Sequence, residues 1–171
     1  EGADAVYSGP LAQEVVKAVN AGPQSLNDFT LADMAAYKAS EQAAVCALYR
    51  GNSVCGMGPP SSGALTIAMV LKMLEPFDLG KTPLDASSVH IISEAQKLAY
   101  ADRRLYMADD RFVPVPKGLL DDAYLVSRRK LIDHRHSMPS ASPGKPPGVR
   151  HGSFGTDGTI ESSGTSHISI V

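Results

Sequence analysis

The sequence predicts a mainly helical α+β fragment with one β-hairpin. Apolar residues recur at helical spacing in several segments, which is typical of amphipathic helices. Two short apolar runs flank Gly51-Asn52, a dipeptide typical of tight hairpin turns. From Ser166 to Val171 polar and apolar residues alternate as in a half-buried strand, although His167 breaks the pattern. A strand needs partners on both edges and no return strand follows Val171, so we expect the 171 residues to be a piece of a larger protein.

The composition gives no support for nucleic acid or anionic lipid as a partner. The chain has 16 basic and 18 acidic residues and a formal net charge of -2, so it lacks the basic surface that such partners require. Its apolar fraction of 43% is sufficient for a real core. No apolar run approaches the roughly 20 residues of a membrane-spanning helix, and no basic-then-apolar signal segment opens the sequence.

Two helices are expected in the first forty residues. The first covers Pro10–Ala21, because Pro favours the first helical turn and a Gly-Pro pair follows the last one. The second begins after Thr30, whose hydroxyl group is the expected cap. Asp33, three residues further on, completes an arrangement close to a capping box, and the helix runs to about Lys38.

The hairpin is expected to pair residues 43–50 with residues 53–57 across the Gly51-Asn52 turn. This register places Cys46 and Cys55 on one face of the hairpin as diagonal neighbours, about 7–8 Å apart. That separation is beyond comfortable disulfide reach. We therefore expect two free, mostly buried thiols.

Two further helices are expected after the hairpin. The first, from Ala64 to about Leu74, is apolar on nearly every side, which predicts that it is buried. Pro76 ends it. The second runs from about Ser87 to Met107 and has one stripe with spacings of four, three, four and three residues. The stripe consists of Ile91, Ala95, Leu98, Asp102 and Leu105.

Asp102 is the one charged residue of this stripe. A carboxylate on a buried helix face needs a partner, because an unpaired buried charge is strongly unfavourable. Arg103, Arg104 or a residue outside the fragment could supply the partner. We interpret Asp102 and Arg103 as an ion pair on the helix surface or at a subunit contact rather than as an acid catalyst.

The last part of the chain changes from helix to an irregular segment. Asp121 or Asp122 is expected to cap a helix that runs through about Asp133. From Ser137 to Gly158 the chain is rich in Pro, Gly, Ser and Lys without apolar periodicity, which predicts an exposed, mobile linker. His134-Arg135-His136 has the spacing of a metal-binding pair, but no third ligand is in view, so no metal site is predicted.

Five segments of the sequence, taken in order and at their spacing, resemble the gamma-glutamyltransferase (gamma-glutamyltranspeptidase) family of the N-terminal nucleophile hydrolase superfamily. The segments are Asp33–Ala39, Tyr49–Gly51, Pro59–Gly63, Ala99–Arg103 and Glu161–Val171. Any one of them alone is a weak signal, but five in register across essentially the whole chain do not arise together by chance. Ala64 departs from the family, which commonly has a second glycine there.

The resemblance implies a place for this chain in a larger, layered αββα fold. The chain then forms the C-terminal part of a large subunit and the first seven residues of a small one. Residues 1–136 are the expected helical layer and hairpin of the large subunit, and residues 137–160 are the expected flexible linker. Residues 161–171 are the expected processing site and first strand of the small subunit.

In that family the precursor cuts itself before a threonine, and the matching residue here is Thr165. The expected autocleavage site is therefore the bond between Gly164 and Thr165. A threonine hydroxyl group needs a base, and the family uses the residue's own α-amine, whose ordinary pKa is about 7.7–8.0. In the uncut chain that nitrogen is an amide, so cleavage creates nucleophile and base together. Gly164 has no Cβ and suits the strained backbone that exposes its carbonyl group.

The activity implied is transfer of a γ-glutamyl group from glutathione or a related donor to an amino acid, a peptide or water. The implied partners are these substrates and the remainder of both subunits, and no cofactor is implied. The family's donor-carboxylate arginine lies upstream of this chain, and its oxyanion glycines and further donor-binding residues lie downstream. We therefore expect the isolated chain to be inactive. A periplasmic or secreted location is suggested by the family resemblance alone.

Polar residues next to Thr165 and at the start of the helix after the hairpin could serve either the chemistry or the structure. Ser166, where the family commonly has a second threonine, is either a supporting hydrogen-bond partner of the nucleophile or an ordinary serine on a strand face. His167 lies two residues from Thr165, on the same strand face without assured contact, and we interpret it as structural. Ser61 and Ser62 could cradle an anion at a helix N-terminus, but we interpret them as caps of the following helix.

Two alternative functions remain open. One is a related acylase that shares the Thr165 chemistry, of the cephalosporin acylase or poly-γ-glutamate depolymerase type. The other is a processing-deficient homologue that serves as a binding or scaffold module. The second alternative would keep the helical layer and lose self-cleavage.

Overall fold

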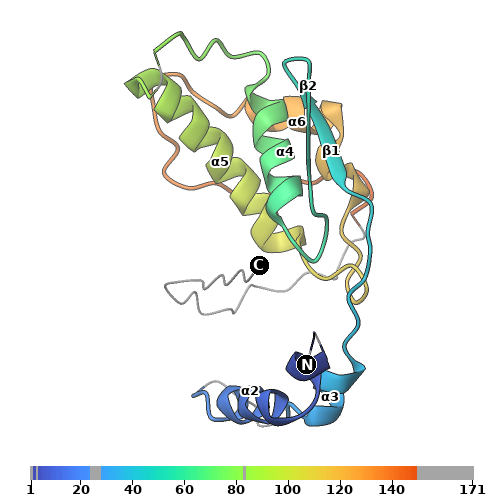
Figure 1. Cartoon of the computed structure of the whole chain (residues 1–171). Coiled ribbons are helices and arrows are strands. Elements are labelled where there is room, and N and C mark those ends of the chain that lie inside the picture. Colours follow the sequence, from blue (N-terminus) through green and yellow to red (C-terminus); the bar gives the residue numbers. More distant parts are fainter. Residues whose placement is uncertain (1, 3, 24–27, 83, 150–171) are drawn as a thin grey trace. The chain divides into compact units, whose positions relative to one another are not determined.

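The computed structural model describes residues 2, 4–23, 28–82 and 84–149. The chain divides into two compact units between Glu41 and Gln42. The described residues form six α-helices, one 3₁₀-helix and one two-stranded antiparallel sheet (Figure 1). The prediction of a mainly helical α+β chain with one hairpin is therefore confirmed. None of the helices in these ranges combines the length and the apolar character needed to cross a lipid bilayer.

The first unit contains three short helices. They are α1 (Asp4–Tyr7), α2 (Pro10–Asn20) and α3 (Leu31–Ala36). The predicted capping box is confirmed, because the Thr30 hydroxyl oxygen accepts a hydrogen bond from the Asp33 amide at 3.2 Å and Asp33 Oδ2 accepts one from the Thr30 amide at 2.9 Å. The sequence predicted α2 and α3 within two residues at each end. It missed α1, which is a single turn.

The hairpin in the second unit joins β1 (Val45–Tyr49) to β2 (Asn52–Gly56). Its turn is Arg50-Gly51, with φ values of 48° and 79°. Positive φ at both central residues is the geometry of a type I′ turn, which suits the twist of two adjacent strands. The predicted Gly51-Asn52 turn is therefore wrong by one residue, and the pairing register changes with it.

Contacts with the end of the following helix explain why an arginine occupies this turn. Positive φ is uncommon for a residue with a side chain. The Arg50 backbone amide donates to both carboxylate oxygens of Glu75, at 3.0 and 3.2 Å. The Arg50 guanidinium group donates to the carbonyl oxygen of Phe77 at 2.7 Å. These three bonds hold the turn against Glu75 and Phe77, which lie 25 and 27 residues further along the chain.

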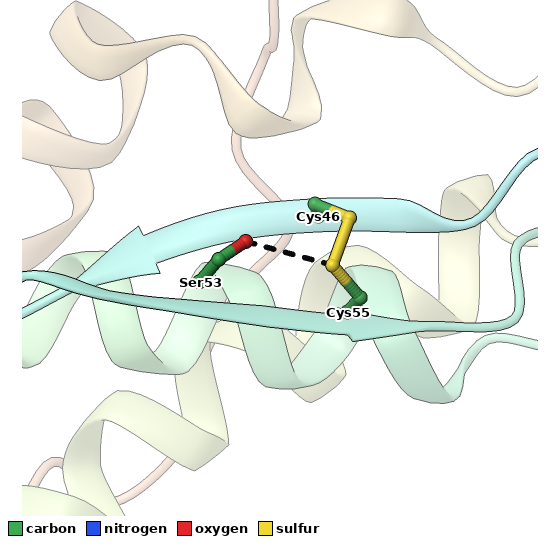
Figure 2. Close-up of a disulfide and its surroundings, with 3 residues drawn as sticks. All are labelled: Cys46, Ser53 and Cys55. Atoms are coloured by element: carbon green, nitrogen blue, oxygen red, sulfur yellow. Dashed lines mark hydrogen bonds between the residues drawn. A yellow bond between two sulfur atoms is a disulfide. The ribbon is translucent and has the colours of Figure 1, made fainter.

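The corrected register places Cys46 directly opposite Cys55, with their Cα atoms 4.1 Å apart. The two residues form a disulfide, and the Ser53 hydroxyl group lies 3.6 Å from the Cys55 sulfur (Figure 2). The prediction of two free, mostly buried thiols is wrong on both counts, because both cysteines are bonded and exposed. The reason is the one-residue shift of the turn, which converts diagonal neighbours into a directly opposed pair.

Four helices follow the hairpin in the described part of the second unit. They are α4 (Gly63–Leu74), α5 (Ala86–Tyr106), the 3₁₀-helix η1 (Lys117–Leu120) and α6 (Asp122–Arg129). Helix α4 is central, since it contacts α5, α6, η1 and both strands of the hairpin (Figure 1). Core side chains from α4, α5 and α6 include Met69, Met73, Leu98 and Leu125. The buried side of α4 and the stripe of α5 are confirmed, although Ile67 on α4 is 53% exposed.

Helix α6 begins where the sequence predicted and ends earlier than expected. Its cap is Asp121, whose carboxylate accepts a hydrogen bond from the Tyr124 amide at 2.8 Å. The helix ends at Arg129 and does not continue to Asp133.

After α6 the chain returns along α5 as an irregular segment, residues 137–149, which we call the strap. It contains no helix or strand, as expected from its composition. It differs from the predicted exposed linker, because Pro146 is buried and Met138, Ala141 and Val149 pack against the core. Hydrogen bonds from helix side chains take the place of regular secondary structure here. The boundaries predicted at residues 136/137 and 160/161 stay predictions.

Candidate functional site

The residues predicted to carry the chemistry lie outside the described residues. These are Gly164 and Thr165, with Ser166 as the possible supporting residue, and His167, which we interpreted as structural, lies outside the described residues too. The structure describes the chain that precedes them up to Val149. The geometry relevant to the site is therefore that of the strap and of the helices that hold it.

A buried polar cluster lies beneath the strap, with the fully buried carboxylate of Asp102 at its centre. Asp102 Oδ2 accepts a hydrogen bond from the Tyr124 hydroxyl group at 2.6 Å. Asp102 Oδ1 accepts one from the Gly144 amide at 2.7 Å and lies 3.1 Å from Arg128 Nη2. Three elements of the chain, α5, α6 and the strap, therefore meet at one carboxylate.

The predicted partners of Asp102 are corrected by this arrangement. The ion-pair partner is Arg128 on α6 rather than Arg103 or Arg104. The two adjacent arginines leave α5 about 100° and 200° around the helix from Asp102, so they do not share its buried face. Arg103 instead donates from Nε to the Ser62 hydroxyl oxygen at 2.8 Å. The reading of Asp102 and Arg103 as an ion pair is therefore wrong.

The cluster is built from donors that point at a single acceptor. Burial raises the pKa of the Asp102 carboxyl group, and the bonds from Tyr124 and Gly144 together with the Arg128 charge oppose that rise. Burial and the adjacent carboxylate both raise the pKa of Tyr124, so its hydroxyl group stays protonated and donates. Arg128 also donates to the carbonyl oxygens of Leu98 and Ser142, at 3.1 and 2.8 Å. This arrangement joins α5, α6 and the strap, and none of its groups is placed to act as a nucleophile.

A second buried carboxylate, Glu94, lies two turns before Asp102 on α5 and is 1% exposed. It accepts hydrogen bonds from Lys97 Nζ at 2.7 Å, the Ser137 hydroxyl group at 2.8 Å and the Met138 amide at 2.8 Å. Burial disfavours the charged form of Glu94, but the bonds from Lys97, Met138 and Ser137 outweigh it and lower the pKa to about 2. Glu94 therefore remains ionised and holds the start of the strap.

The lowered pKa predicts a pH-dependent contribution of Glu94 to stability. A carboxyl group with a depressed pKa in the folded state stabilises fully above its ordinary pKa of 4.5, and this contribution is lost as the pH falls through about 2. Glu94→Gln is expected to cost about 1.5–3 kcal/mol at neutral pH, the range for hydrogen bonds to a charged group. Thermal unfolding of the full-length protein between pH 7 and pH 2 measures both effects.

The matched control for this prediction is Glu41→Gln, which changes an exposed carboxylate. The difference between wild type and Glu94→Gln should shrink toward zero as the pH approaches 2, while Glu41→Gln follows the wild type throughout. A difference that stays constant over the whole pH range would show that Glu94 acts through packing and not through its charge.

Ser61 and Ser62 lie at the start of α4, as predicted, but the predicted capping by the Ser62 hydroxyl is wrong. Ser62 occupies the N-cap position without a hydrogen bond from its side chain to the helix backbone. Its hydroxyl oxygen accepts the bond from Arg103 instead. Ser61 Oγ accepts a hydrogen bond from the Gly63 amide at 3.3 Å. Ser62 thus ties α4 to α5, whereas Ser61 bonds to the first residue of α4.

The two histidines after α6 have protein partners. His136 Nδ1 lies 3.2 Å from Asp133 Oδ1, and the His134 ring packs against Phe77 with ring centroids 5.4 Å apart. Within the described ranges, no group of three or more His, Cys, Asp and Glu side chains is arranged to hold a metal ion.

Several residues of the buried clusters were not found from the sequence. Glu94 has a detectable signal, because it lies three residues after Ile91 and four before Leu98, on the predicted buried stripe. Arg128 and Tyr124 also share one face of a helix at a spacing of four residues. Gly144 has no such signal, since only the close approach of α6 gives it a role.

A family model matches the entire chain, and individual relatives match most or nearly all of it. Residues 1–171 match the sequence model of the family described as Gamma-glutamyltranspeptidase. The Glutathione hydrolase proenzyme of Escherichia coli K12 is 36% identical over 172 residues, which cover 99% of this chain and 28% of that protein. The Acylase ACY 1 proenzyme of Pseudomonas sp. SE83 is also 36% identical, over 135 residues that cover 78% of this chain and 24% of that protein.

A solved structure shares the fold. The gamma-glutamyltranspeptidase of Helicobacter pylori is similar with a TM-score of 0.73 and 32% sequence identity, over 89% of this chain and 44% of that chain. The chain thus spans about a quarter of the length of the curated relatives that it matches.

Proposed function

Because this chain belongs to the gamma-glutamyltranspeptidase family, we propose that it is part of a self-processing γ-glutamyl acyltransferase and hydrolase whose nucleophile is Thr165. The observation that carries the proposal is the extent of the family match. It includes the last eleven residues, where Gly164-Thr165-Ser166 has the glycine and hydroxyl residues that self-cleavage requires. The names of relatives such as the Escherichia coli glutathione hydrolase describe proenzymes, which supports processing of a precursor.

Self-cleavage in this proposal is an acyl shift followed by hydrolysis. Thr165 Oγ attacks the carbonyl carbon of Gly164, and the bond from that carbon to the Thr165 nitrogen breaks. The hydroxyl proton ends on the departing nitrogen, which becomes the free α-amine. Water then hydrolyses the ester between Gly164 and Thr165, giving a new C-terminal carboxylate and restoring the threonine hydroxyl group.

The mature reaction repeats this chemistry on an external acyl group. The α-amine of Thr165 takes the proton from the residue's own hydroxyl group, since an α-amine has an ordinary pKa of about 7.7–8.0, close to neutral pH. The hydroxyl oxygen accepts a γ-glutamyl group from glutathione or a related donor, and an amino acid, a peptide or water then receives it. Donor binding and oxyanion stabilisation depend on residues outside this chain, so the isolated chain is inactive.

We propose a periplasmic or secreted location for the whole protein.

The described part of the chain supplies the framework for this chemistry. The buried carboxylates Glu94 and Asp102 fix the strap to α5, and the strap continues toward the proposed cleavage site. Both carboxylates are buried, and protein donors bind both oxygens of each. We therefore interpret Glu94 and Asp102 as structural residues and not as acid catalysts.

A second candidate function is an acylase with a different donor. It is favoured by the Pseudomonas acylase proenzyme, whose identity to this chain equals that of the glutathione hydrolase, at 36%. Both functions use the same Thr165 chemistry, so they differ only in the acyl group that is accepted. The scaffold alternative differs from both, because it predicts no cleavage.

The test uses the full-length protein with two chromogenic or mass-detected donors, a γ-glutamyl anilide and a glutaryl-substituted cephalosporin nucleus. The proposal predicts two subunits on a denaturing gel and release of the anilide in preference to the cephalosporin nucleus. Preference for the cephalosporin compound would assign the acylase function. A single persistent chain without activity would assign the scaffold function.

A further inference from the structure

The Cys46–Cys55 disulfide lies on the open face of the hairpin. Cys46 and Leu48 on β1 share this face with Ser53 and Cys55 on β2, and all four residues are exposed. Ala47 points to the opposite face and is 8% exposed, since β1 packs against α4. Within the described ranges, both cysteines are therefore reachable from solvent. An exposed disulfide is open to attack by a dissolved thiol, because access is one of the factors that set the rate of thiol–disulfide exchange.

The hairpin has other contacts that keep it in place when the disulfide opens. Its turn is held by the bonds from Arg50 to Glu75 and Phe77. The disulfide joins residues nine positions apart, and a bridge across so short a loop restricts the unfolded chain less than a bridge across a long one. Opening the bond therefore leaves the two sulfur atoms opposite each other, so the bond can open and close again in the folded protein.

Ser53 makes the two sulfur atoms of the disulfide unequal. Its hydroxyl oxygen lies 3.6 Å from Cys55 Sγ (Figure 2). Neither sulfur of a disulfide carries a hydrogen, so the hydroxyl group is the donor in this contact. Among the described residues, no such donor lies at Cys46 Sγ. A hydrogen bond stabilises a thiolate as it forms, so Cys55 is the better leaving group and Cys46 is the sulfur that an incoming thiol attacks.

We propose that Cys46 is a site of reversible modification by small cysteinyl thiols. The thiolate of the small molecule attacks Cys46 Sγ, and the bond between Cys46 and Cys55 breaks. The electron pair of that bond goes to Cys55 Sγ, which then takes a proton from water. One disulfide replaces another, so the step needs no further oxidant or reductant. The reverse attack of the Cys55 thiolate on Cys46 Sγ restores the protein disulfide and releases the small thiol.

The function proposed above supplies thiols of this class. Glutathione carries a cysteinyl thiol, and removal of its γ-glutamyl group leaves cysteinylglycine, which carries the same thiol. A working enzyme would thus expose Cys46 to its donor and to its product. The choice of these two molecules rests on the proposed function, whereas the site itself rests only on the exposed disulfide and the Ser53 contact.

The test incubates the wild-type full-length protein with N-acetylcysteine or with glutathione and stops the exchange with N-ethylmaleimide. N-acetylcysteine has no γ-glutamyl group, so its reaction does not depend on the proposed function. Arg50 is the one basic residue between the two cysteines, so trypsin separates them into two peptides for mass spectrometry. We expect the small thiol on Cys46 and the maleimide on Cys55, with an excess of at least about twofold over the opposite arrangement, the lower limit for one hydrogen bond.

Ser53→Ala tests the cause of this preference, with Ser40→Ala, another exposed serine, as the matched control. Ser53→Ala should bring the ratio of the two arrangements close to one, and Ser40→Ala should keep the wild-type ratio. Absence of any adduct with either thiol would overturn the proposal. So would an adduct that is equally or more abundant on Cys55 in the wild-type protein, or a preference for Cys46 that Ser53→Ala leaves unchanged.

The glutathione arm separates this proposal from the proposed function. If both are right, Cys46 carries glutathione at early times and cysteinylglycine as well after prolonged incubation. Adducts of glutathione alone at all times would keep the modification site and refute the γ-glutamyl activity. Release of cysteinylglycine into solution without any adduct on Cys46 would keep the activity and refute the modification site.

Discussion

Replacing Thr165 with alanine in the full-length precursor is expected to leave one uncut chain. The hydroxyl oxygen of Thr165 is the attacking atom in the proposed acyl shift, so without it no ester forms and no α-amine is released. The same variant lacks the nucleophile of the mature reaction. Loss of a catalytic nucleophile lowers kcat by roughly 10⁴-fold or more, so γ-glutamyl transfer should become undetectable. A denaturing gel and the intact mass of the product measure the first effect.

Two further variants make this result specific. Thr165→Ser keeps a hydroxyl group at the attacking position and should still be cut, while Ser163→Ala removes a hydroxyl group two residues upstream and should be cut at the wild-type rate. Mass spectrometry that found Thr165→Ala cleaved at the same bond would refute the role assigned to Thr165.

Arg128→Met is expected to cause the largest loss of stability in the described part of the chain. It removes the ion-pair partner of the fully buried Asp102 carboxylate and leaves that charge with no cation beside it, held only by the hydrogen bonds from Tyr124 and Gly144. Removing one partner of a buried pair typically costs about 3–5 kcal/mol. The free energy of unfolding of the full-length, uncut Thr165→Ala precursor, measured with and without Arg128→Met, tests this value.

A neighbouring arginine and a double variant separate charge from packing. Arg129→Met changes the next residue of α6, which points away from Asp102, and should alter stability by less than about 1 kcal/mol. Asp102→Asn combined with Arg128→Met removes both charges and should recover part of the loss. If the double variant is as unstable as Arg128→Met alone, packing of the arginine stem and not the buried charge determines the effect.

Most of the helices were predictable because their signals are local, although α1 was missed and α6 ends earlier than predicted. The capping box of Thr30 and Asp33, the Gly-Pro boundaries of α2 and the apolar stripe of α5 each depend on residues within a few turns of one another. The family resemblance also came from sequence alone, and the match over residues 1–171 confirms it. The fold class follows from both, and the similarity to solved structures confirms it as well.

The hairpin register was not predictable from its own residues. Gly51-Asn52 is the more typical turn dipeptide, whereas the structure uses Arg50-Gly51. The residues that stabilise Arg50 at positive φ, Glu75 and Phe77, are 25 and 27 positions away in the sequence. A shift of one residue was enough to turn two separate thiols into a disulfide.

The strap was not predictable for the same reason. Its composition is that of a linker, and none of its residues shows that the carboxylates of Glu94 and Asp102 will bind its backbone. Backbone hydrogen bonds to distant side chains leave no periodic signal in the sequence. The partner of Asp102 was missed because the prediction considered adjacent arginines, whereas Arg128 is 26 residues further along the chain.

The most direct test of the account is the N-terminal sequence of the small subunit produced by the wild-type full-length precursor. The account predicts that it begins Thr-Ser-His, with the free α-amine on Thr165. A small subunit that begins at any other residue, or a purified active protein that remains one chain, would contradict the claim that cleavage of the Gly164–Thr165 bond creates the catalytic group.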